Sequence, residues 1–148
     1  MVYLNYQIYI ERRDKMIEKL LKLQENSYAK YSNYRVSAIV VTKDLKEFNG
    51  VNVENASYGA CICAERVALT SMIAAGYKKG DVKELNLMVS SGSIGTPCFL
   101  CRQTISELCD KETIINCYST KGEVKTYTVR ELCPHPFSEE DLKWNQDL

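Results

Sequence analysis

Two cysteine-containing stretches of the chain each stand where a helical pattern begins. They are ACICAERVAL (60–69) and TPCFLCRQ (96–103). The spacing of apolar residues predicts that helices follow over 63–75 and 96–109. These two helix starts limit the possible folds more than any other feature of the sequence. Their cysteines can act together only if the fold brings the two helix starts into contact.

Three of these cysteines are placed to act together. Thr96 is a good N-cap and Pro97 suits a first helical position, so Cys98 and Cys101 fall in the first turn of their helix and point the same way. Cys63 opens the other helix. A helix N-terminus carries partial positive charge, which favours thiolate over thiol. Two helix starts placed end to end would therefore gather three thiolates.

The predicted elements alternate between helix and strand along the whole chain. This order predicts an α/β fold with a mixed sheet and helices on both of its faces, a three-layer arrangement. No repeat, linker or low-complexity stretch divides the sequence, so we expect one domain over residues 1–148. The expected elements are a helix within 14–31, strands over 35–42 and 47–58, a helix over 63–75, a strand over 82–91, a helix over 96–109, strands over 112–120 and 123–129, and a short helix after Ser138.

Composition excludes several classes of protein. Nineteen basic and nineteen acidic residues give a net charge of zero, which disfavours a protein that mainly binds polynucleotides. The N-terminus is a poor signal peptide, and no apolar run is long enough to span a membrane. Seven cysteines cannot all pair internally. We therefore expect a cytoplasmic protein with reduced thiols, in which cysteine clusters serve metal binding or catalysis.

A catalytic zinc ion would explain the three thiols and the carboxylate beside them. Three protein ligands leave a fourth tetrahedral position open, as in catalytic zinc sites. Glu65 lies two residues after Cys63 and could move protons without binding the metal. A C-x-x-C pair alone fits redox chemistry equally well. A structural zinc would need a fourth protein ligand, for which His135, the only histidine, is a candidate, and we expect that residue in a surface loop.

The remaining cysteines have no partner at ligand spacing. Free cysteine is a common core residue. We therefore expect core packing for the other four, which are Cys61, Cys109, Cys117 and Cys133.

The sequence resembles the cytidine deaminases, in particular the small nucleoside-specific branch. The resemblance rests on four motifs in the order of that family, and it extends from about Tyr28 to Phe137. Zinc nucleobase deaminases in general share the layout of a Cys-x-Glu, a Pro-Cys-x-x-Cys and a non-ligand glutamate. The motifs are YSNYRVSA (31–38), GVNVENASYGACICAERVAL (50–69), PCFLCRQ (97–103) and ELCPHPF (131–137).

The resemblance implies a role for each matching residue. It implies one Zn²⁺ per chain bound by Cys63, Cys98 and Cys101, with Glu65 as the proton shuttle. The implied substrate-binding residues are Asn52 and Glu54 at the ribose 3′-hydroxyl, Tyr34 against the pyrimidine, Ala64, and Phe137, which closes a pocket of a neighbouring subunit. Tyr58 at a subunit junction, Gln103 and Arg66 are implied as supporting residues, in a homotetramer.

Pattern alone favours plainer interpretations of some of these residues. Asn52 and Glu54 alternate with valines and could be the polar face of a strand, while Tyr34 or Phe137 taken alone would suit a core. Arg66 could be a surface ion-pair residue. The argument for a role of Arg66 in the site rests on charge. Zinc with three thiolates has a formal charge of −1, which a nearby cation would offset. Arg102 is the second candidate for this cation.

The chain also departs from the family pattern. Phe99 and Leu100 are bulky residues between the two ligands of the C-x-x-C pair, where the family has a small residue. They could pack into the core, form a subunit contact or narrow the site. Val36-Ser37-Ala38 replaces Val-Gly-Ala, and Tyr34 adds a hydroxyl where the family usually has phenylalanine.

The function implied is zinc-dependent hydrolytic deamination of cytidine and 2′-deoxycytidine to uridine and 2′-deoxyuridine, with release of ammonia, in pyrimidine salvage. The substrate would be a small nucleoside and not a polynucleotide. Two alternatives are a blasticidin-type deaminase of nucleoside analogues and a non-catalytic zinc-binding scaffold. Glu65 argues against the scaffold, which has no need of a carboxylate beside an open metal.

Overall fold

A five-stranded mixed sheet forms the centre of the computed structural model, which describes residues 2–143. The strand order is β2-β1-β3-β4-β5, and β3 and β4 form a parallel pair while the other neighbours are antiparallel. A parallel pair needs a crossover connection, which the helix between these two strands supplies. The strands are β1 (Val36–Thr42), β2 (Glu47–Val51), β3 (Val82–Val89), β4 (Ile114–Tyr118) and β5 (Val124–Thr128).

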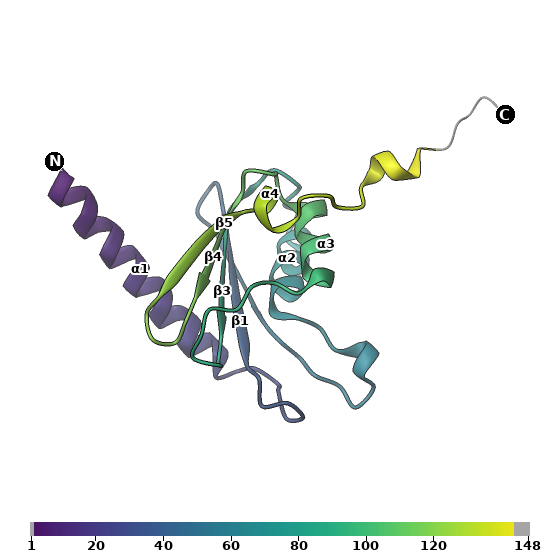
Figure 1. Cartoon of the computed structure of the whole chain (residues 1–148), viewed down its shortest axis with the longest axis horizontal. Coiled ribbons are helices and arrows are strands. Elements are labelled where there is room, and N and C mark those ends of the chain that lie inside the picture. The colour runs from purple at the N-terminus through teal and green to yellow at the C-terminus, as the bar shows by residue number, and fades with distance from the viewer. Residues whose placement is uncertain (1, 144–148) are drawn as a thin grey trace.

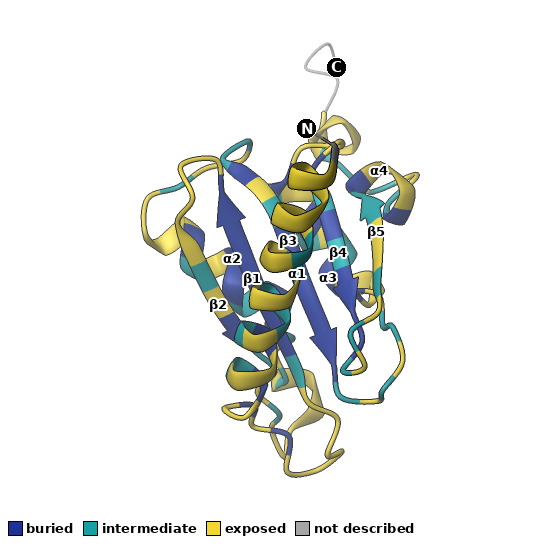
Figure 2. Ribbon diagram, turned by 90° about the vertical axis from the view of Figure 1, so that its left-hand side faces the viewer, coloured by how far each residue is buried: buried dark blue, intermediate teal, exposed yellow. Residues whose placement is uncertain are grey.

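Helices cover both faces of this sheet, as the sequence predicts. The helix α1 (Val2–Gln24) crosses one face, and α2 (Ala64–Ala74) and α3 (Phe99–Leu108) lie on the other (Figures 1 and 2). A short helix α4 (Val129–Leu132) follows β5, and two 3₁₀ turns, η1 (Tyr58–Ala60) and η2 (Glu139–Leu142), complete the described elements. Within residues 2–143, no helix is both long and apolar enough to cross a bilayer.

The first helix is longer at its start and shorter at its end than predicted. It begins at Val2 because the uncharged stretch before Glu11 contains no helix breaker, although it lacks the amphipathic pattern of the later turns. It ends at Gln24, whose side-chain amide donates to the carbonyl oxygens of Arg35 and Met88. The chain then forms turns, with Asn33 in the left-handed region at φ 56°.

Other helix and strand boundaries differ from the predicted ones for identifiable reasons. Thr96 and Pro97 do not start α3, whose N-cap is Cys98, because both are held by Arg102. The Arg102 guanidinium donates to the Pro97 carbonyl oxygen over 2.8 Å and to the Thr96 hydroxyl over 3.1 Å. The predicted strand over 47–58 ends at Val51, and α4 was not predicted. The hairpin turn between β4 and β5 is confirmed, with Gly122 at φ 90°.

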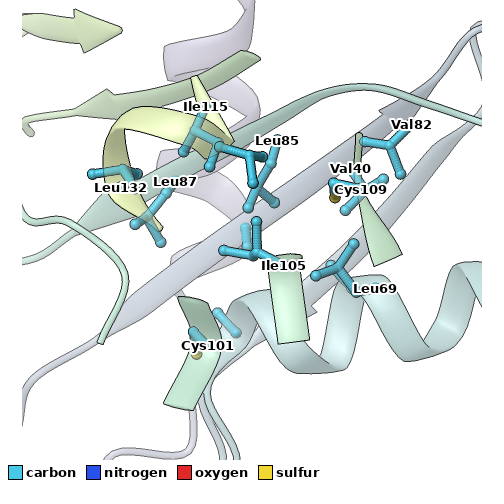
Figure 3. Close-up of a cluster of buried hydrophobic side chains, with 14 of the residues drawn as sticks. Val40, Leu69, Val82, Leu85, Leu87, Cys101, Ile105, Cys109, Ile115 and Leu132 are labelled. Carbon is cyan, nitrogen blue, oxygen red and sulfur yellow. The ribbon is translucent and has the colours of Figure 1, made fainter. Parts of the chain in front are cut away.

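The main core lies between the sheet and the pair α2 and α3 (Figure 3). Leu69 from α2 and Ile105 from α3 pack against Leu85, Leu87 and Ile115 of the sheet, all at most 1% exposed. This packing fixes the orientation of both helices and therefore of their N-termini. The smaller core under α1 contains Leu20, Ile39, Val41, Met88 and Tyr118.

The cysteines outside the predicted cluster have three kinds of surroundings. Cys109 and Cys117 are buried in the main core as predicted, and burial raises the pKa of each thiol to about 12, so they are inert at neutral pH. Cys133 packs against the edge of the core and its thiol donates to the Arg102 carbonyl oxygen. The core prediction is wrong for Cys61, which is half-exposed and lines a surface pocket.

Replacing Ile105 by Ala tests whether this core holds α3 in place. Ile105 is 0% exposed, and removing buried methyl and methylene groups leaves a cavity. We expect the free energy of unfolding to fall by about 2–5 kcal/mol. Denaturant titration of the zinc-loaded chain at fixed protein concentration measures this. Glu107→Ala, at an exposed position of the same helix, is the matched control and should stay within about 0.5 kcal/mol. Equal unfolding curves for the two variants would contradict the assignment.

Candidate active site

The thiols of Cys63, Cys98 and Cys101 converge at the N-termini of α2 and α3. Cys63 is the N-cap of α2, Cys98 is the N-cap of α3, and Cys101 lies in the first turn of α3. Their sulfur atoms all lie within 4.8 Å of one another, and the Sγ atoms of Cys63 and Cys98 are 3.9 Å apart. Zinc–sulfur bonds of about 2.3 Å at tetrahedral angles place sulfurs about 3.8 Å apart. The predicted meeting of two helix starts is confirmed, and the donor set fits one zinc ion.

The charge in this cluster is centred on Cys63. A hydrogen bond from Cys101, followed by one from Cys98 and by the positive charge of Arg66, lowers the pKa of Cys63 to about 6, although partial burial opposes this. The pKa of Cys101 is raised, first because it donates that hydrogen bond and second because it is buried. One thiolate therefore exists near neutral pH, as zinc binding requires, since thiolate is the form that binds metal.

Glu65 lies beside the thiols in the first turn of α2 and is only 4% exposed. Burial raises the pKa of its carboxyl to about 7, and the charge of Cys63 adds to the effect, while a hydrogen bond with Cys101 opposes it. A carboxyl with a pKa near neutral can both accept and release a proton at physiological pH. Its position, close to the thiol cluster but outside it, is the one that the sequence predicts for a proton shuttle.

Gly50 allows the first turn of α2 to lie directly against the sheet. A Cβ atom at this position in β2 would be 2.1 Å from the Ala64 carbonyl oxygen and 2.6 Å from the Ala68 amide nitrogen. Both of these are backbone atoms, so no side chain could rotate to make room. Because Ala64 stands between Cys63 and Glu65, the absence of a side chain at Gly50 sets the position of both functional groups. In the sequence Gly50 stands inside one of the four motifs, and nothing local marks it as the point of contact.

A pocket of about 330 Å³ lies beside the cluster and includes Cys63 in its lining. Its volume is in the range of small-molecule sites. The residues that surround it come from the loop after α1 and from the segment between β2 and α2. They are Tyr31, Ser32, Asn52, Val53, Glu54, Asn55, Tyr58, Cys61, Ile62 and Cys63, so three of the predicted binding or supporting residues share one pocket with a thiol of the cluster.

Asn52 connects β2 to the loop that precedes β1. Its side-chain oxygen accepts from the Val36 amide over 2.8 Å and from the Ser27 hydroxyl, and its side-chain nitrogen donates to the Tyr34 carbonyl oxygen over 2.8 Å. The amide therefore holds the backbone of Tyr34, which is not itself among the residues that line the pocket. It follows the end of β2 and is not the polar face of a strand, because its side chain is directed to this neighbouring loop.

Glu54 is held in an ionised state by the same loop. One carboxylate oxygen accepts from the backbone amides of Tyr31 and Ser32, over 2.8 and 3.2 Å, and the other accepts from the Ser32 hydroxyl. The bond from Ser32 and then the backbone bonds lower the pKa of Glu54. Ser27 and Ser32 were not predicted as site residues. Nothing in their local sequence shows that they contact residues after β2.

The predicted aromatic residues are exposed. Tyr34, Tyr58 and Phe137 are 43%, 78% and 58% exposed, so none is a core residue. Gln103 donates from its side-chain nitrogen to the Phe137 carbonyl oxygen over 2.8 Å, which ties the C-terminal segment to α3. Ala64 is fully buried, and its carbonyl oxygen faces Gly50 of β2.

Arg66, Arg102 and the two bulky residues of the C-x-x-C stretch have distinct surroundings. Arg66 is half-buried and close enough to Cys63 to lower its pKa. Arg102 is occupied by backbone groups before α3 and at the end of α4, and its guanidinium lies 4.7 Å from the centre of the Phe99 ring. Phe99 and Leu100 are 81% and 59% exposed, so they do not pack into the core. His135 is exposed in a C-terminal loop, as predicted.

A mixed three-layer fold, three convergent thiols at the edge of a pocket and a buried carboxylate beside these thiols are the features of a zinc-dependent hydrolytic deaminase. Residues 10–117 match the family model described as the cytidine and deoxycytidylate deaminase zinc-binding region. The chain belongs to the cytidine deaminase family.

Individual relatives agree with this assignment. A cytidine deaminase of Halalkalibacterium halodurans is 35% identical over 130 residues, which is 88% of this chain and 97% of that protein. The crystal structure of a cytidine deaminase from Burkholderia pseudomallei has a TM-score of 0.80 and 40% identity, covering 84% of this chain and 98% of that one. The cytidine deaminase of Mycobacterium leprae has a TM-score of 0.69 and 32% identity, covering 82% and 97%. The family and the three-thiol cluster together show one zinc ion per chain as the cofactor.

Gly50→Ala tests the packing that places Cys63 and Glu65. The added Cβ must displace α2 from β2, since it meets only backbone atoms at these distances. We expect substoichiometric zinc by elemental analysis and a loss of about 1–3 kcal/mol in the free energy of unfolding. Gly59→Ala is the matched control, because a Cβ there meets nothing within 4 Å. If the two variants bind zinc equally and unfold together, the close approach at Gly50 is not what positions the site.

Proposed function

We propose that this chain catalyses the hydrolytic deamination of cytidine and 2′-deoxycytidine to uridine and 2′-deoxyuridine, with release of ammonia. The observation that carries the proposal is the buried Glu65, whose pKa is raised to about 7, next to three thiols at the edge of a nucleoside-sized pocket. Relatives named cytidine deaminase over most of their length support the choice of substrate. A zinc-binding scaffold would gain nothing from a buried carboxylate in this place.

Glu65 moves the protons of the reaction. When bound by Cys63, Cys98 and Cys101, zinc supplies a Lewis acid that makes water more acidic. Glu65 takes a proton from the attacking water as its oxygen forms a bond to C4 of the pyrimidine, and delivers that proton to N3. It then transfers the second proton of the same water to the exocyclic nitrogen, so that the C4–N bond breaks and ammonia leaves. The carboxylate ends the cycle in its starting state.

Asn52 and Glu54 position the sugar in this proposal. Both residues line the pocket, and Oε1 of Glu54, which accepts only from the Ser32 hydroxyl, has a lone pair beyond the one used by the loop. They bind the ribose 3′-hydroxyl, while Tyr34, whose carbonyl oxygen Asn52 holds, contacts the pyrimidine. A site that binds a free 3′-hydroxyl cannot accommodate a 3′-phosphodiester, which has no hydroxyl to donate. The substrate is therefore a nucleoside and not a polynucleotide.

Arg66 offsets the negative charge of three thiolates. A zinc ion with three thiolate ligands carries a formal charge of −1, and this disfavours removal of a proton from water. The effect of Arg66 on Cys63 supports a compensating role. Arg102, the second candidate, instead holds the segment before Cys98 through its bonds to Thr96 and Pro97.

The active assembly is a homotetramer in the cytoplasm that serves pyrimidine salvage. Tyr58 and Phe137 are exposed in the single chain and would be covered at subunit contacts, with Phe137 closing the pocket of a neighbouring subunit. Gln103 holds the backbone of Phe137 for this purpose. Exposed Phe99 and Leu100 suit a subunit contact better than a narrowed pocket, because neither is among the residues that line it.

Glu65→Gln tests the proton shuttle. The amide keeps the size of the side chain but cannot carry protons, so the rate of ammonia release from cytidine should fall by about 10³-fold or more. Elemental analysis should still find one zinc ion per chain. Cys98→Ala is the contrasting variant, which should lose both zinc and activity. Loss of zinc in Glu65→Gln would make this residue a ligand, and retained activity would refute its role as the proton shuttle. Absence of ammonia release from cytidine by the zinc-loaded wild-type chain would refute the proposed function.

Glu54→Ala tests recognition of the sugar. Deamination takes place at C4, away from the ribose, so sugar contacts act by positioning the substrate and by binding energy. We expect kcat/KM for cytidine to fall by about 10²-fold, while the slow reaction of free cytosine changes little. The loss of ultraviolet absorbance with each substrate measures both. Equal losses for cytidine and cytosine would show that Glu54 supports the fold of the loop and does not read the sugar.

A further inference from the structure

Gly95 lies in the loop between β3 and α3, at a point where a side chain would have no room. An ideal Cβ atom at this position would be 2.8 Å from both methyl carbons of Val89 and 3.4 Å from the hydroxyl oxygen of Tyr34. The φ angle of Gly95 is not in the left-handed region. The glycine is therefore needed for the space that it leaves and not for its backbone conformation.

Hydrogen bonds hold this loop in place on both sides of Gly95. The backbone amide of Arg35 donates to the Ser90 hydroxyl over 2.9 Å, and the Ser90 amide donates to the Arg35 carbonyl oxygen over 2.9 Å. These two bonds extend the pairing of β1 with β3 by one residue. On the other side, Arg102 binds both of the residues that follow Gly95. The loop therefore runs beside Tyr34 in a fixed position on its way to α3.

The backbone of Tyr34 is fixed as well. Its amide donates to the Ser32 hydroxyl over 3.0 Å, and its carbonyl oxygen accepts from the Asn52 side chain over 2.8 Å. Only the direction of the ring is left to be decided by the surroundings. The hydroxyl at its end lies against Gly95, and Tyr34 is not among the residues that line the pocket beside Cys63. The polar end of the ring is thus directed to the loop and not into the pocket.

We propose that Gly95 positions Tyr34 for substrate binding. Because Gly95 has no side chain, it leaves room for the tyrosine hydroxyl against the loop, so that the apolar part of the ring faces the pyrimidine. Without this room the hydroxyl would turn toward the base and occupy part of its position. The inference rests on the proposed deamination of cytidine, in which Tyr34 contacts the pyrimidine. It explains how this chain accommodates a tyrosine where the family usually has phenylalanine.

A double-mutant cycle between positions 34 and 95 tests the inference in the zinc-loaded full chain. In Gly95→Ala the added Cβ displaces the loop and the tyrosine hydroxyl, so KM for cytidine should rise by about fivefold or more while kcat changes by less than about twofold. In Tyr34→Phe and in Tyr34→Phe/Gly95→Ala no hydroxyl is present, and KM should stay within about twofold of the wild-type value. The loss of ultraviolet absorbance on deamination measures both constants.

Stability gives a second readout, because the clash with Val89 does not depend on the hydroxyl. Gly95→Ala should lower the free energy of unfolding by the same amount with Tyr34 as with phenylalanine at that position, as measured by denaturant titration. Elemental analysis should find one zinc ion per chain in every variant. Ser93→Ala, at an exposed position of the same loop, is the matched control and should leave KM and stability unchanged.

A crystal structure of the zinc-loaded wild-type chain with uridine, the product of the proposed reaction, needs no variant to fold. The Tyr34 hydroxyl oxygen should lie within about 4.5 Å of an atom of Gly95 and make no contact with the base. A hydroxyl bonded to the pyrimidine would overturn the proposal.

Three kinetic outcomes would also overturn it. They are an unchanged KM in Gly95→Ala, an equal rise of KM with either residue at position 34, and a rise in Tyr34→Phe alone as large as that in Gly95→Ala. The second would show that Gly95 acts only through the fold, and the third that the hydroxyl binds the substrate. If the wild-type chain releases no ammonia from cytidine, the proposed function fails and this inference fails with it. An active wild-type chain with any of the three results refutes only the role of Gly95.

Discussion

The contact between the first turn of α2 and the strand β2 is the constraint on which the site depends. At Gly50 the helix backbone lies closer than any side chain would permit, with an ideal Cβ only 2.1 Å from the Ala64 carbonyl oxygen. This contact determines how far Cys63 and Glu65 lie from the sheet. Ile105 fixes α3 on the same face, so Cys98 and Cys101 arrive at the same point. Two helix N-termini then favour thiolates where a zinc ion requires them.

The same packing gives Glu65 its chemistry. A carboxyl on a solvent-exposed helix start would be ionised at neutral pH, and the helix N-terminus would favour that ionisation. Here burial outweighs the helix and raises the pKa to about 7, so one residue can accept and return a proton in a single turnover. Tight packing of α2 against the sheet is thus also the source of the acid–base role proposed for Glu65, because it removes water from the carboxyl.

The pocket is built from chain segments that depend on one another. Asn52 and Glu54 bind the loop from Ser27 to Val36 through its backbone and its two serine hydroxyls. In the proposed function the same two residues bind the ribose. Because Asn52 and Glu54 bind both the loop and the sugar, a substitution at either position affects the loop as well as the sugar contact. The comparison of cytidine with cytosine separates the two effects, since both substrates need the loop but only one has a sugar.

Local patterns in the sequence determined much of this protein. Periodicity located the helices and strands, and the spacing of Cys63, Cys98, Cys101 and Glu65 indicated both the metal and the proton carrier, because first-turn geometry depends only on neighbouring residues. Tertiary structure decided what depends on distant contacts. The bonds of Arg102 place the N-cap of α3 at Cys98 and not at the predicted Thr96. Gly50 determines how closely α2 packs on the sheet. The hydroxyls of Ser27 and Ser32 contact Asn52 and Glu54 from another loop. Tertiary structure also left Cys61 beside the pocket, because burial is a property of the packed chain and not of the local sequence.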